Sequence, residues 1–170
     1  MTSNKAPHIL LGAGGGIIPT STPEQLRDLL KHLKTLPTSI YGIDTAAVYP
    51  SANPGKSETL LGEAGIGNSG LVLDTKVLMF PPGGRSNSDG REKDGGPLSR
   101  VNILRSSKES LERLKVPKVR CLYAHSPDRN TPAAETVGAF GNILKAGEAE
   151  VVSSYIEFIT VLFETNTFSK

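Results

Sequence analysis

The sequence predicts an α/β fold in which a parallel sheet is covered by helices. Four times along the chain, a short apolar segment is followed by a segment with helical periodicity, and the apolar segments begin near residues 9, 40, 71 and 119. Alternation of strand and helix builds a parallel sheet, because each helix carries the chain back to the start of the next strand. Two architectures fit this pattern: a doubly wound open sheet, and part of an eight-stranded (β/α)8 barrel.

Length and composition narrow the class of protein. The chain has 170 residues, of which 37% are hydrophobic and 21% charged, a balance typical of one soluble globular domain. A net charge of +2 gives no electrostatic reason to expect nucleic acid as a partner. The single cysteine, Cys121, excludes an internal disulfide, and no apolar run approaches the roughly 18 residues of a membrane span. We therefore expect a cytoplasmic protein with neither nucleic acid nor a membrane as its partner.

The first unit contains a strand at residues 9–11, a glycine-rich turn and an amphipathic helix. Thr22, Pro23 and Gln25 predict the start of the helix, because they match a threonine N-cap, a first-turn proline and the closing residue of a capping box. Leucines then recur at helical spacing on one face: Leu26, Leu29, Leu30, Leu33 and Leu36. We expect Pro37 to end this helix.

The second and third units follow the same plan. A strand at residues 40–44 precedes a helix that Ser57 is expected to cap, and a strand from residue 71 ends at residues 74–76. Residues 81–97 form a long loop rich in Gly, Pro and Ser, and Ser99 begins the next helix. Four apolar residues are predicted on the inward side of that helix: Val101, Leu104, Leu111 and Leu114.

The fourth unit has a strand at residues 119–123 and a helix that Thr131 and Pro132 are expected to start. Gly147 is a natural C-terminal stop for this helix. Its predicted inward residues are Val137, Phe140, Ile143 and Leu144. Residues 158–163 are β-prone and nearly uncharged, which makes them a pairing or aggregation segment.

Four polar residues follow the ends of three successive predicted strands: Asp44, Tyr49, Lys76 and His125. In both candidate architectures, side chains at the carboxyl edge of the sheet converge on the functional site. A tyrosine phenol is a weak acid at neutral pH, and a neighbouring lysine cation stabilises its phenolate. A carboxylate paired with the lysine keeps it charged, and an imidazole can orient a carbonyl oxygen. The set suits reduction of an aldehyde or ketone, with Tyr49 protonating oxygen while a donor delivers hydride to carbon.

Each member of this set also has a purely structural interpretation. Asp44 suits a turn, Tyr49 could pack its own loop, and Lys76 could be a solvated charge. The prediction of a site therefore depends on the four residues as a set. No residues near Cys121 have the spacing of metal ligands, so no metal site is predicted.

The segments that carry these residues resemble the NADPH-dependent aldo-keto reductases. Residues 43–49 and 57–62 look like that family's Asp-Thr-Ala…Tyr segment and the Ser-Glu…Leu-Gly helix after it. Residues 73–77 are similar to the strand that bears the catalytic lysine of the family, and residues 106–128 resemble the helix and strand that lead to its histidine. The resemblance covers about residues 8–147, and residues 128–132 look closest to the fungal-type and aflatoxin-aldehyde-reductase-like branches.

This resemblance implies a (β/α)8 barrel, of which the chain holds about the first half. It also implies NADP(H) as cofactor and a small-molecule carbonyl compound as substrate. Within the family pattern, Tyr49 would be the general acid, Lys76 and Asp44 would tune it, and His125 would orient the carbonyl. Asp44 would also contact the cofactor.

The chain departs from the family after Gly147. The family continues into a fifth strand with a Ser-Asn pair that holds the nicotinamide carboxamide, whereas Ser153 and Ser154 stand at a shorter spacing without the asparagine. Neither serine is therefore assigned to the cofactor. We expect a partial reductase domain at residues 1–155 and a divergent tail at residues 156–170.

Three functional alternatives remain open. The first is a working carbonyl reductase, and the second is a catalytically silent fragment that lacks the cofactor-binding half. The third is an open-sheet binding protein of another family, in which the four positions coincide by chance. A half barrel leaves the edge of its sheet unpaired, so we also expect self-association through that edge.

Overall fold

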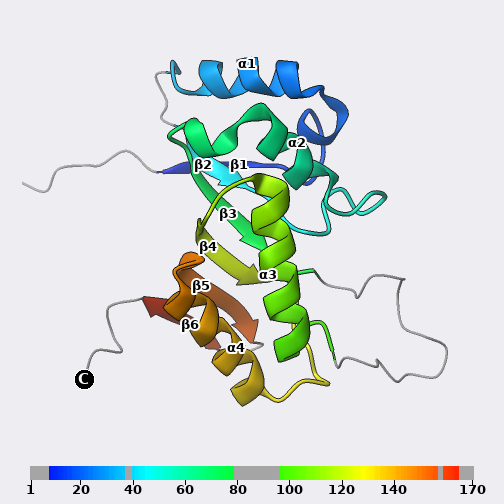
Figure 1. The fold of residues 1–170 in the computed structure, drawn as a ribbon, viewed down its shortest axis with the longest axis vertical. Helices are drawn as coiled ribbons and strands as arrows, with labels where there is room; N and C mark the ends of the chain where they lie inside the picture. Colours follow the sequence, from blue (N-terminus) through cyan, green and yellow to red (C-terminus); the bar gives the residue numbers. More distant parts are fainter. Residues whose placement is uncertain (1–7, 37–39, 79–95, 157–158, 165–170) are drawn as a thin grey trace, which may run out of the picture.

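The computed structural model describes residues 8–36, 40–78, 96–156 and 159–164, and it is built around one six-stranded sheet (Figure 1). The strands are β1 (Ile9–Gly12), β2 (Ile40–Asp44), β3 (Val72–Lys76), β4 (Val119–Ala124), β5 (Ala149–Ile156) and β6 (Ile159–Glu164). The α-helices are α1 (Pro23–Leu33), α2 (Lys56–Ala64), α3 (Arg100–Leu114) and α4 (Ala133–Ala146). Two short 3-10 helices, η1 (Ile18–Thr20) and η2 (Ile66–Asn68), precede α1 and β3.

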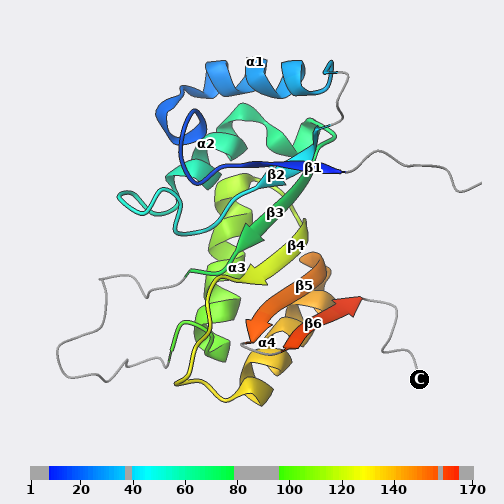
Figure 2. The ribbon, with the colours of Figure 1, turned by 180° about the vertical axis from the view of Figure 1, so that it is seen from behind.

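The order of the strands distinguishes between the two predicted architectures. The strands lie side by side in sequence order, and β1 to β5 are all parallel. The four helices lie on one face of this sheet, as the front and back views show (Figures 1 and 2). A doubly wound sheet instead reverses its strand order and carries helices on both faces. The α/β prediction is therefore confirmed, and the arrangement is that of a barrel segment.

The apolar core lies between the sheet and the helices. Ile43 pairs in register with Leu73, and Leu122 pairs with Val152, so these side chains form rows on one face of the sheet. The helices add buried residues to the same cluster, including Leu26, Leu30, Leu61, Ile103, Leu114, Phe140 and Ile143. The opposite face of the sheet, which would line the interior of a barrel, carries the residues of the candidate site.

Local signals set the ends of α1 only in part. Thr22 caps the helix, and both hydrogen bonds of the capping box with Gln25 are present, as predicted. The helix ends at Leu33, however, so the prediction of Pro37 as its end was wrong. The Thr35 backbone N–H and hydroxyl both donate to the His32 carbonyl, and this tighter turn ends the α-helix about one turn early.

Two other predicted helix starts were wrong for a shared reason. Gly55 occupies the N-cap position of α2, and Pro132 occupies that of α4. The Ser57 hydroxyl donates to the Ala13 carbonyl instead, and the Thr131 hydroxyl donates to Asp128. Both hydroxyls that could have served as caps are thus engaged elsewhere, Ser57 by a residue 44 positions away and Thr131 by a carboxylate three positions before it. The predicted stop at Gly147 and the start at Ser99 are both confirmed.

The buried face of α3 differs from the predicted apolar face. Ser106, Ser107 and Ser110 are buried there beside Ile103, whereas Val101 is 56% exposed. On α4, Val137 is likewise 39% exposed, while Phe140 and Ile143 are buried. The two valines were therefore wrongly placed in the core. No helix in the described part of the chain is long and apolar enough to span a membrane.

The β-prone tail forms β6, which pairs antiparallel with β5. Val152 lies opposite Phe163 and Ser154 lies opposite Val161 in this pairing. The far edge of β5 is therefore covered by the chain's own tail, and the outer strands of the described sheet are β1 and β6. The predicted long loop lies almost wholly within residues 79–95, outside the described residues.

Candidate active site

The candidate site begins with an ion pair between the ends of two neighbouring strands. Asp44 is the last residue of β2, and Lys76 is the last residue of β3. The Lys76 Nζ lies 2.6 Å from Asp44 Oδ1 and also donates to the Thr45 carbonyl at 2.8 Å. The Lys76 side chain is only 16% exposed, whereas that of Asp44 is 32% exposed. The ammonium is therefore fixed in place, and part of the carboxylate remains open to a ligand.

Tyr49 lies over this ammonium group. The Lys76 Nζ is 5.2 Å from the centroid of the Tyr49 ring, within the range of a cation–π contact. The backbone of Tyr49 is held by hydrogen bonds to the Ala46 carbonyl and from the Ser57 N–H. On the other side, a Cβ placed on Gly14 would come within 3.2 Å of the tyrosine ring, so the glycine-rich turn packs directly against it.

His125 completes the cluster from the loop after β4. Its ring meets the Tyr49 ring edge to face, with centroids 5.5 Å apart. Burial lowers the pKa of His125, and the Lys76 cation lowers it further, which outweighs the opposing effect of Asp44. The imidazole is therefore neutral at neutral pH, and it can donate one N–H to a substrate oxygen.

The structure thus brings together the four residues that the sequence singled out. A fixed cation, a carboxylate, a phenol and a neutral imidazole make up a set suited to proton transfer. Their catalytic roles stay predictions. Among the residues that the structure describes, no cluster of three His, Cys, Asp or Glu side chains could hold a metal ion.

Tyr123 is a site residue that the sequence reasoning missed. It pairs in register with Lys76, and its ring centroid lies 5.9 Å from the lysine Nζ. Burial raises its pKa far above the ordinary tyrosine value, and a hydrogen bond with Cys121 adds to this. A signal for Tyr123 was present in the sequence. Side chains two residues apart along a strand point to the same face, and Tyr123 stands two residues before His125.

A second ion pair lies close to the first. Asp74, which pairs in register with Asp44, is fully buried and is hydrogen-bonded to Arg120. Burial raises the pKa of Asp74 and outweighs the lowering by Arg120. The Asp74 Oδ1 has no hydrogen-bond partner among the described residues. No sequence motif indicates this pair, because its partners are 46 residues apart and meet only when β3 and β4 pair.

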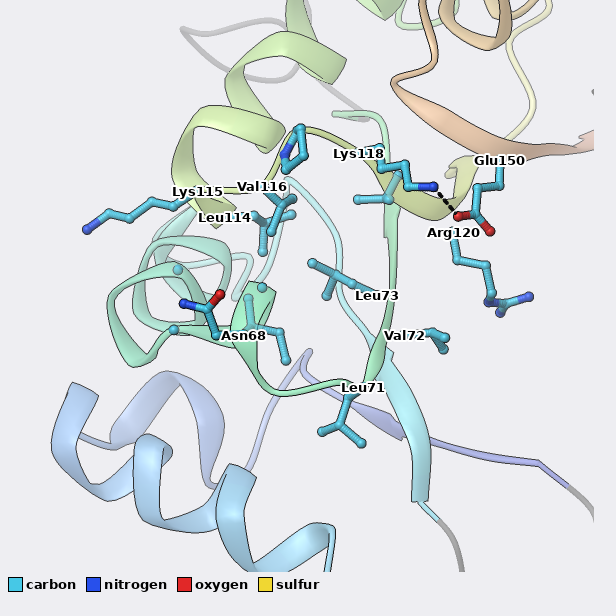
Figure 3. A pocket seen from close by; sticks show the side chains of 16 residues that line it. Asn68, Leu71, Val72, Leu73, Leu114, Lys115, Val116, Lys118, Arg120 and Glu150 are labelled. Carbon is cyan, nitrogen blue, oxygen red and sulfur yellow. Dashed lines mark hydrogen bonds and ion pairs between the residues drawn. The ribbon is translucent and has the colours of Figure 1, made fainter.

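A groove in the described surface lies away from this site. This groove of about 540 Å³ lies where β3 and β4 begin, lined by Leu71, Val72 and Lys118 among others (Figure 3). The four site residues lie at the opposite, carboxyl ends of the strands. In barrels of this kind the amino-end face serves stability, so we assign the chemistry to the residue cluster rather than to the groove.

Comparisons with known proteins agree with this geometry. The sequence pattern of the Aldo/keto reductase family matches residues 11–153. An Arabidopsis thaliana protein described as a probable voltage-gated potassium channel subunit beta is 36% identical over 110 residues, which are 62% of this chain and 30% of that protein. A Schizosaccharomyces pombe protein described as a putative subunit of the same kind is 34% identical over 130 residues, 74% of this chain and 34% of that protein.

A solved structure gives the corresponding likeness in three dimensions. The crystal structure of a thermostable aldo-keto reductase bound to the inhibitor epalrestat matches 90% of this chain with a TM-score of 0.63 and 25% identity. The match covers 50% of that reductase. The chain therefore has the fold of about half of a reductase barrel, and it spans about a third of the length of the two curated relatives.

Proposed function

The chain belongs to the aldo/keto reductase family, and on that premise we propose that its site reduces the carbonyl group of a small aldehyde or ketone. The observation that carries this proposal is the contact of one ammonium with both a carboxylate and a phenol ring. Lys76 lies 2.6 Å from Asp44 Oδ1 and 5.2 Å from the centroid of the Tyr49 ring.

Tyr49 is the proton donor in this proposal. As the carbonyl carbon is reduced, negative charge develops on the oxygen, and the tyrosine hydroxyl transfers its proton there. The phenolate left behind is stabilised by the Lys76 cation. Asp44 and the Thr45 carbonyl hold that cation in place, so the ammonium group does not have to move during the proton transfer.

His125 orients the substrate. Its imidazole is neutral, because burial and the Lys76 cation both lower its pKa. A neutral imidazole donates a hydrogen bond without competing with Tyr49 as the acid. Its ring stands edge to face against Tyr49, so the two side chains border the same site.

The hydride donor that the family implies is NADP(H), and we propose it for this chain. When bound, the cofactor supplies the hydride. Of the described residues, Asp44 fits it, because its carboxylate is partly exposed beside the Lys76 ammonium at the carboxyl edge of the sheet and is open to a ligand.

The test is consumption of NADPH in the presence of an aromatic aldehyde. We expect saturable turnover that falls by about 10²- to 10⁴-fold in Tyr49→Phe, because positioned proton transfer contributes that much. The matched control is Tyr41→Phe, since Tyr41 packs against His8 and Arg120 rather than Lys76. Equal rates for Tyr49→Phe and the wild type would show that Tyr49 is not the acid.

A second candidate function is favoured by the extent of the match. Because the chain spans about a third of the two curated relatives, it could carry the four residues without reducing a carbonyl. Titration of NADPH with the protein, followed by NADPH fluorescence, separates the alternatives. A reductase changes the fluorescence of the cofactor saturably, and a silent fragment leaves it unchanged.

A further inference from the structure

We propose that Ser57 and Glu58, the adjacent residues near the start of α2, are positioning residues that set the placement of Tyr49 relative to Lys76. The catalytic meaning of this inference rests on the proposed function. Its geometry comes from the contacts of two side chains that are fully buried. Neither residue touches the reacting groups. Each holds a segment that carries one of them.

Ser57 holds the segment that carries Tyr49. Its backbone N–H donates to the Tyr49 carbonyl at 3.1 Å, and its hydroxyl donates to the Ala13 carbonyl at 2.9 Å. Ala13 precedes Gly14, the residue against which the Tyr49 ring packs. One serine therefore fixes the backbone of the tyrosine and also the turn that supports its ring.

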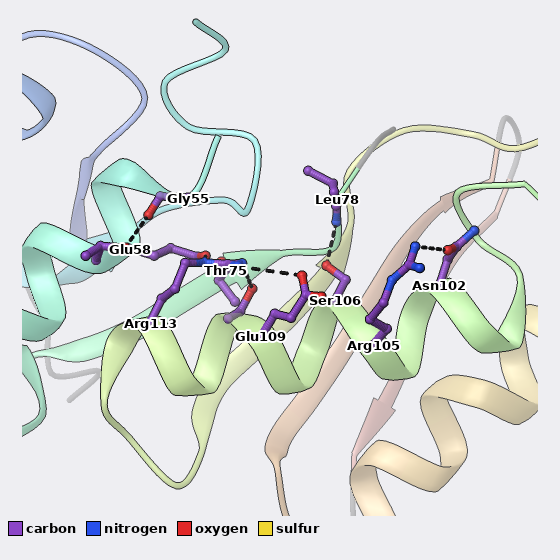
Figure 4. A network of polar contacts seen from close by, with 11 residues as sticks. Gly55, Glu58, Thr75, Leu78, Asn102, Arg105, Ser106, Glu109 and Arg113 are labelled. Atoms are coloured by element: carbon purple, nitrogen blue, oxygen red, sulfur yellow. Dashed lines mark hydrogen bonds and ion pairs between the residues drawn. The ribbon is translucent and has the colours of Figure 1, made fainter. Parts of the chain in front are cut away.

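Glu58 holds the strand that carries Lys76. Its Oε1 accepts a hydrogen bond from the Thr75 hydroxyl at 2.5 Å, and its Oε2 accepts one from Arg113 Nε at 2.8 Å (Figure 4). Thr75 precedes Lys76 in β3, and consecutive side chains of a strand point to opposite faces. Thr75 thus anchors the strand from the helix side, while Lys76 extends toward the site on the other side.

The chemistry of Glu58 explains why this anchor is rigid. A carboxylate with no exposure to solvent is costly to bury unless each oxygen has a strong partner. Both oxygens are satisfied here, one by a hydroxyl and one by a guanidinium. Movement of Thr75 would leave Oε1 without its donor, so the position of β3 at Lys76 is fixed relative to α2. Because Ser57 is the preceding residue, Tyr49 is fixed relative to the same helical turn.

The experiment uses fluorine NMR of the full chain labelled with fluorotyrosine. The chain has four tyrosines, and the Tyr49 resonance is assigned by its loss in Tyr49→Phe. We expect Thr75→Val, which removes the hydroxyl and keeps the shape, to move this resonance. We also expect it to lower kcat for carbonyl reduction by about 10-fold with little change in KM. Thr75→Ser keeps the hydroxyl and should restore both values.

The matched control is Thr136→Val. Thr136 is also buried, and its hydroxyl donates to the Leu98 carbonyl at 3.0 Å, away from the site. This variant loses the same kind of hydrogen bond, so it should lower stability without moving the Tyr49 resonance. An equal shift of the Tyr49 resonance in Thr75→Val and Thr136→Val would show that Thr75 has only a general structural role. That result would overturn the proposal.

The readouts separate this inference from the proposed function. If the wild-type chain reduces no carbonyl, the proposed function fails, but the fluorine resonance still reports whether Thr75→Val moves Tyr49. An unmoved resonance in folded Thr75→Val overturns the positioning role. Should Thr75→Val not fold, Ser57→Ala decides the matter: a moved Tyr49 resonance supports the proposal, and an unmoved one overturns it.

Discussion

The Lys76 Nζ lies 2.6 Å from Asp44 Oδ1, and the Lys118 Nζ lies at the same distance from Glu150 Oε1. The two ion pairs differ in their exposure to solvent. The side chains of the first are 16% and 32% exposed, whereas those of the second are 55% and 52% exposed. Water screens exposed charges, so equal distances do not mean equal contributions to stability.

Asp44→Asn should therefore lower the free energy of unfolding by about 1–2 kcal/mol, because it leaves a largely buried ammonium without its counter-charge. Glu150→Gln should lower it by less than about 1 kcal/mol, as is usual for exposed pairs. Urea unfolding of the two variants beside the wild type makes the comparison. Equal losses would contradict the assignment of Lys76 and Asp44 as a preorganised pair.

Gly62 is required where α2 meets α3. A Cβ at Gly62 would lie 2.1 Å from the Arg113 carbonyl oxygen, a backbone atom that cannot turn aside as a side chain would. Gly62→Ala should therefore destabilise the fold by about 1–3 kcal/mol, as overpacking does, despite the better helix propensity of alanine. Thermal and urea unfolding measure the loss.

The control for this variant is Gly138→Ala in α4. Gly138 is exposed and has open space around its Cβ position, so alanine should stabilise the helix there by about 0.5–1 kcal/mol. Opposite signs for the two substitutions are the expected result. A stabilising Gly62→Ala would show that α2 and α3 do not approach each other so closely.

The sequence predicted the parts of the fold that depend on local order. The capping box of Thr22 and Gln25 needs only neighbouring residues, and it formed as expected. The convergence of Lys76 and His125 follows from strand order alone, because the carboxyl ends of neighbouring parallel strands share one edge. Such features could be predicted without knowing which helix packs against which strand.

The polar burial that the sequence did not indicate concerns side chains whose partners lie far away in the chain. Ser106 on α3 looks like a surface residue, yet it is buried and accepts a hydrogen bond from the Leu78 N–H. Glu58 likewise finds Thr75 and Arg113, which are 17 and 55 residues away. Binary patterning assigns serine and glutamate to solvent, and only the tertiary fold supplies the partners that allow their burial.

Cys121 should be unreactive in the folded protein. The residue is 2% exposed, and burial is the main reason that the pKa of its thiol is raised to about 11. Only a thiolate reacts with iodoacetamide, so we expect native labelling near pH 8 to be at least roughly 100-fold slower than labelling of an ordinary thiol. Mass spectrometry follows the reaction, with urea-unfolded chain as the control. Equal rates for folded and unfolded protein would contradict the burial of β4.

The final prediction concerns the pH dependence of stability at His125. Burial and the Lys76 cation lower the pKa of this imidazole in the folded state, so the unfolded chain binds its proton more readily. Stability therefore increases as the pH rises from the lowered folded-state pKa to the ordinary value near 6.5, and it falls as acid protonates the imidazole. We expect a lower urea midpoint at about pH 5 than at about pH 7.

His125→Gln should reduce this difference between the two pH values, because glutamine does not titrate. The control is His32→Gln, which replaces an exposed imidazole at the end of α1 rather than one in the site. If His125→Gln keeps the full wild-type pH dependence, the histidine is not held neutral by its surroundings. Its role as a neutral hydrogen-bond donor to the substrate would then fail with it, since a cationic imidazole would compete with Tyr49 as the acid.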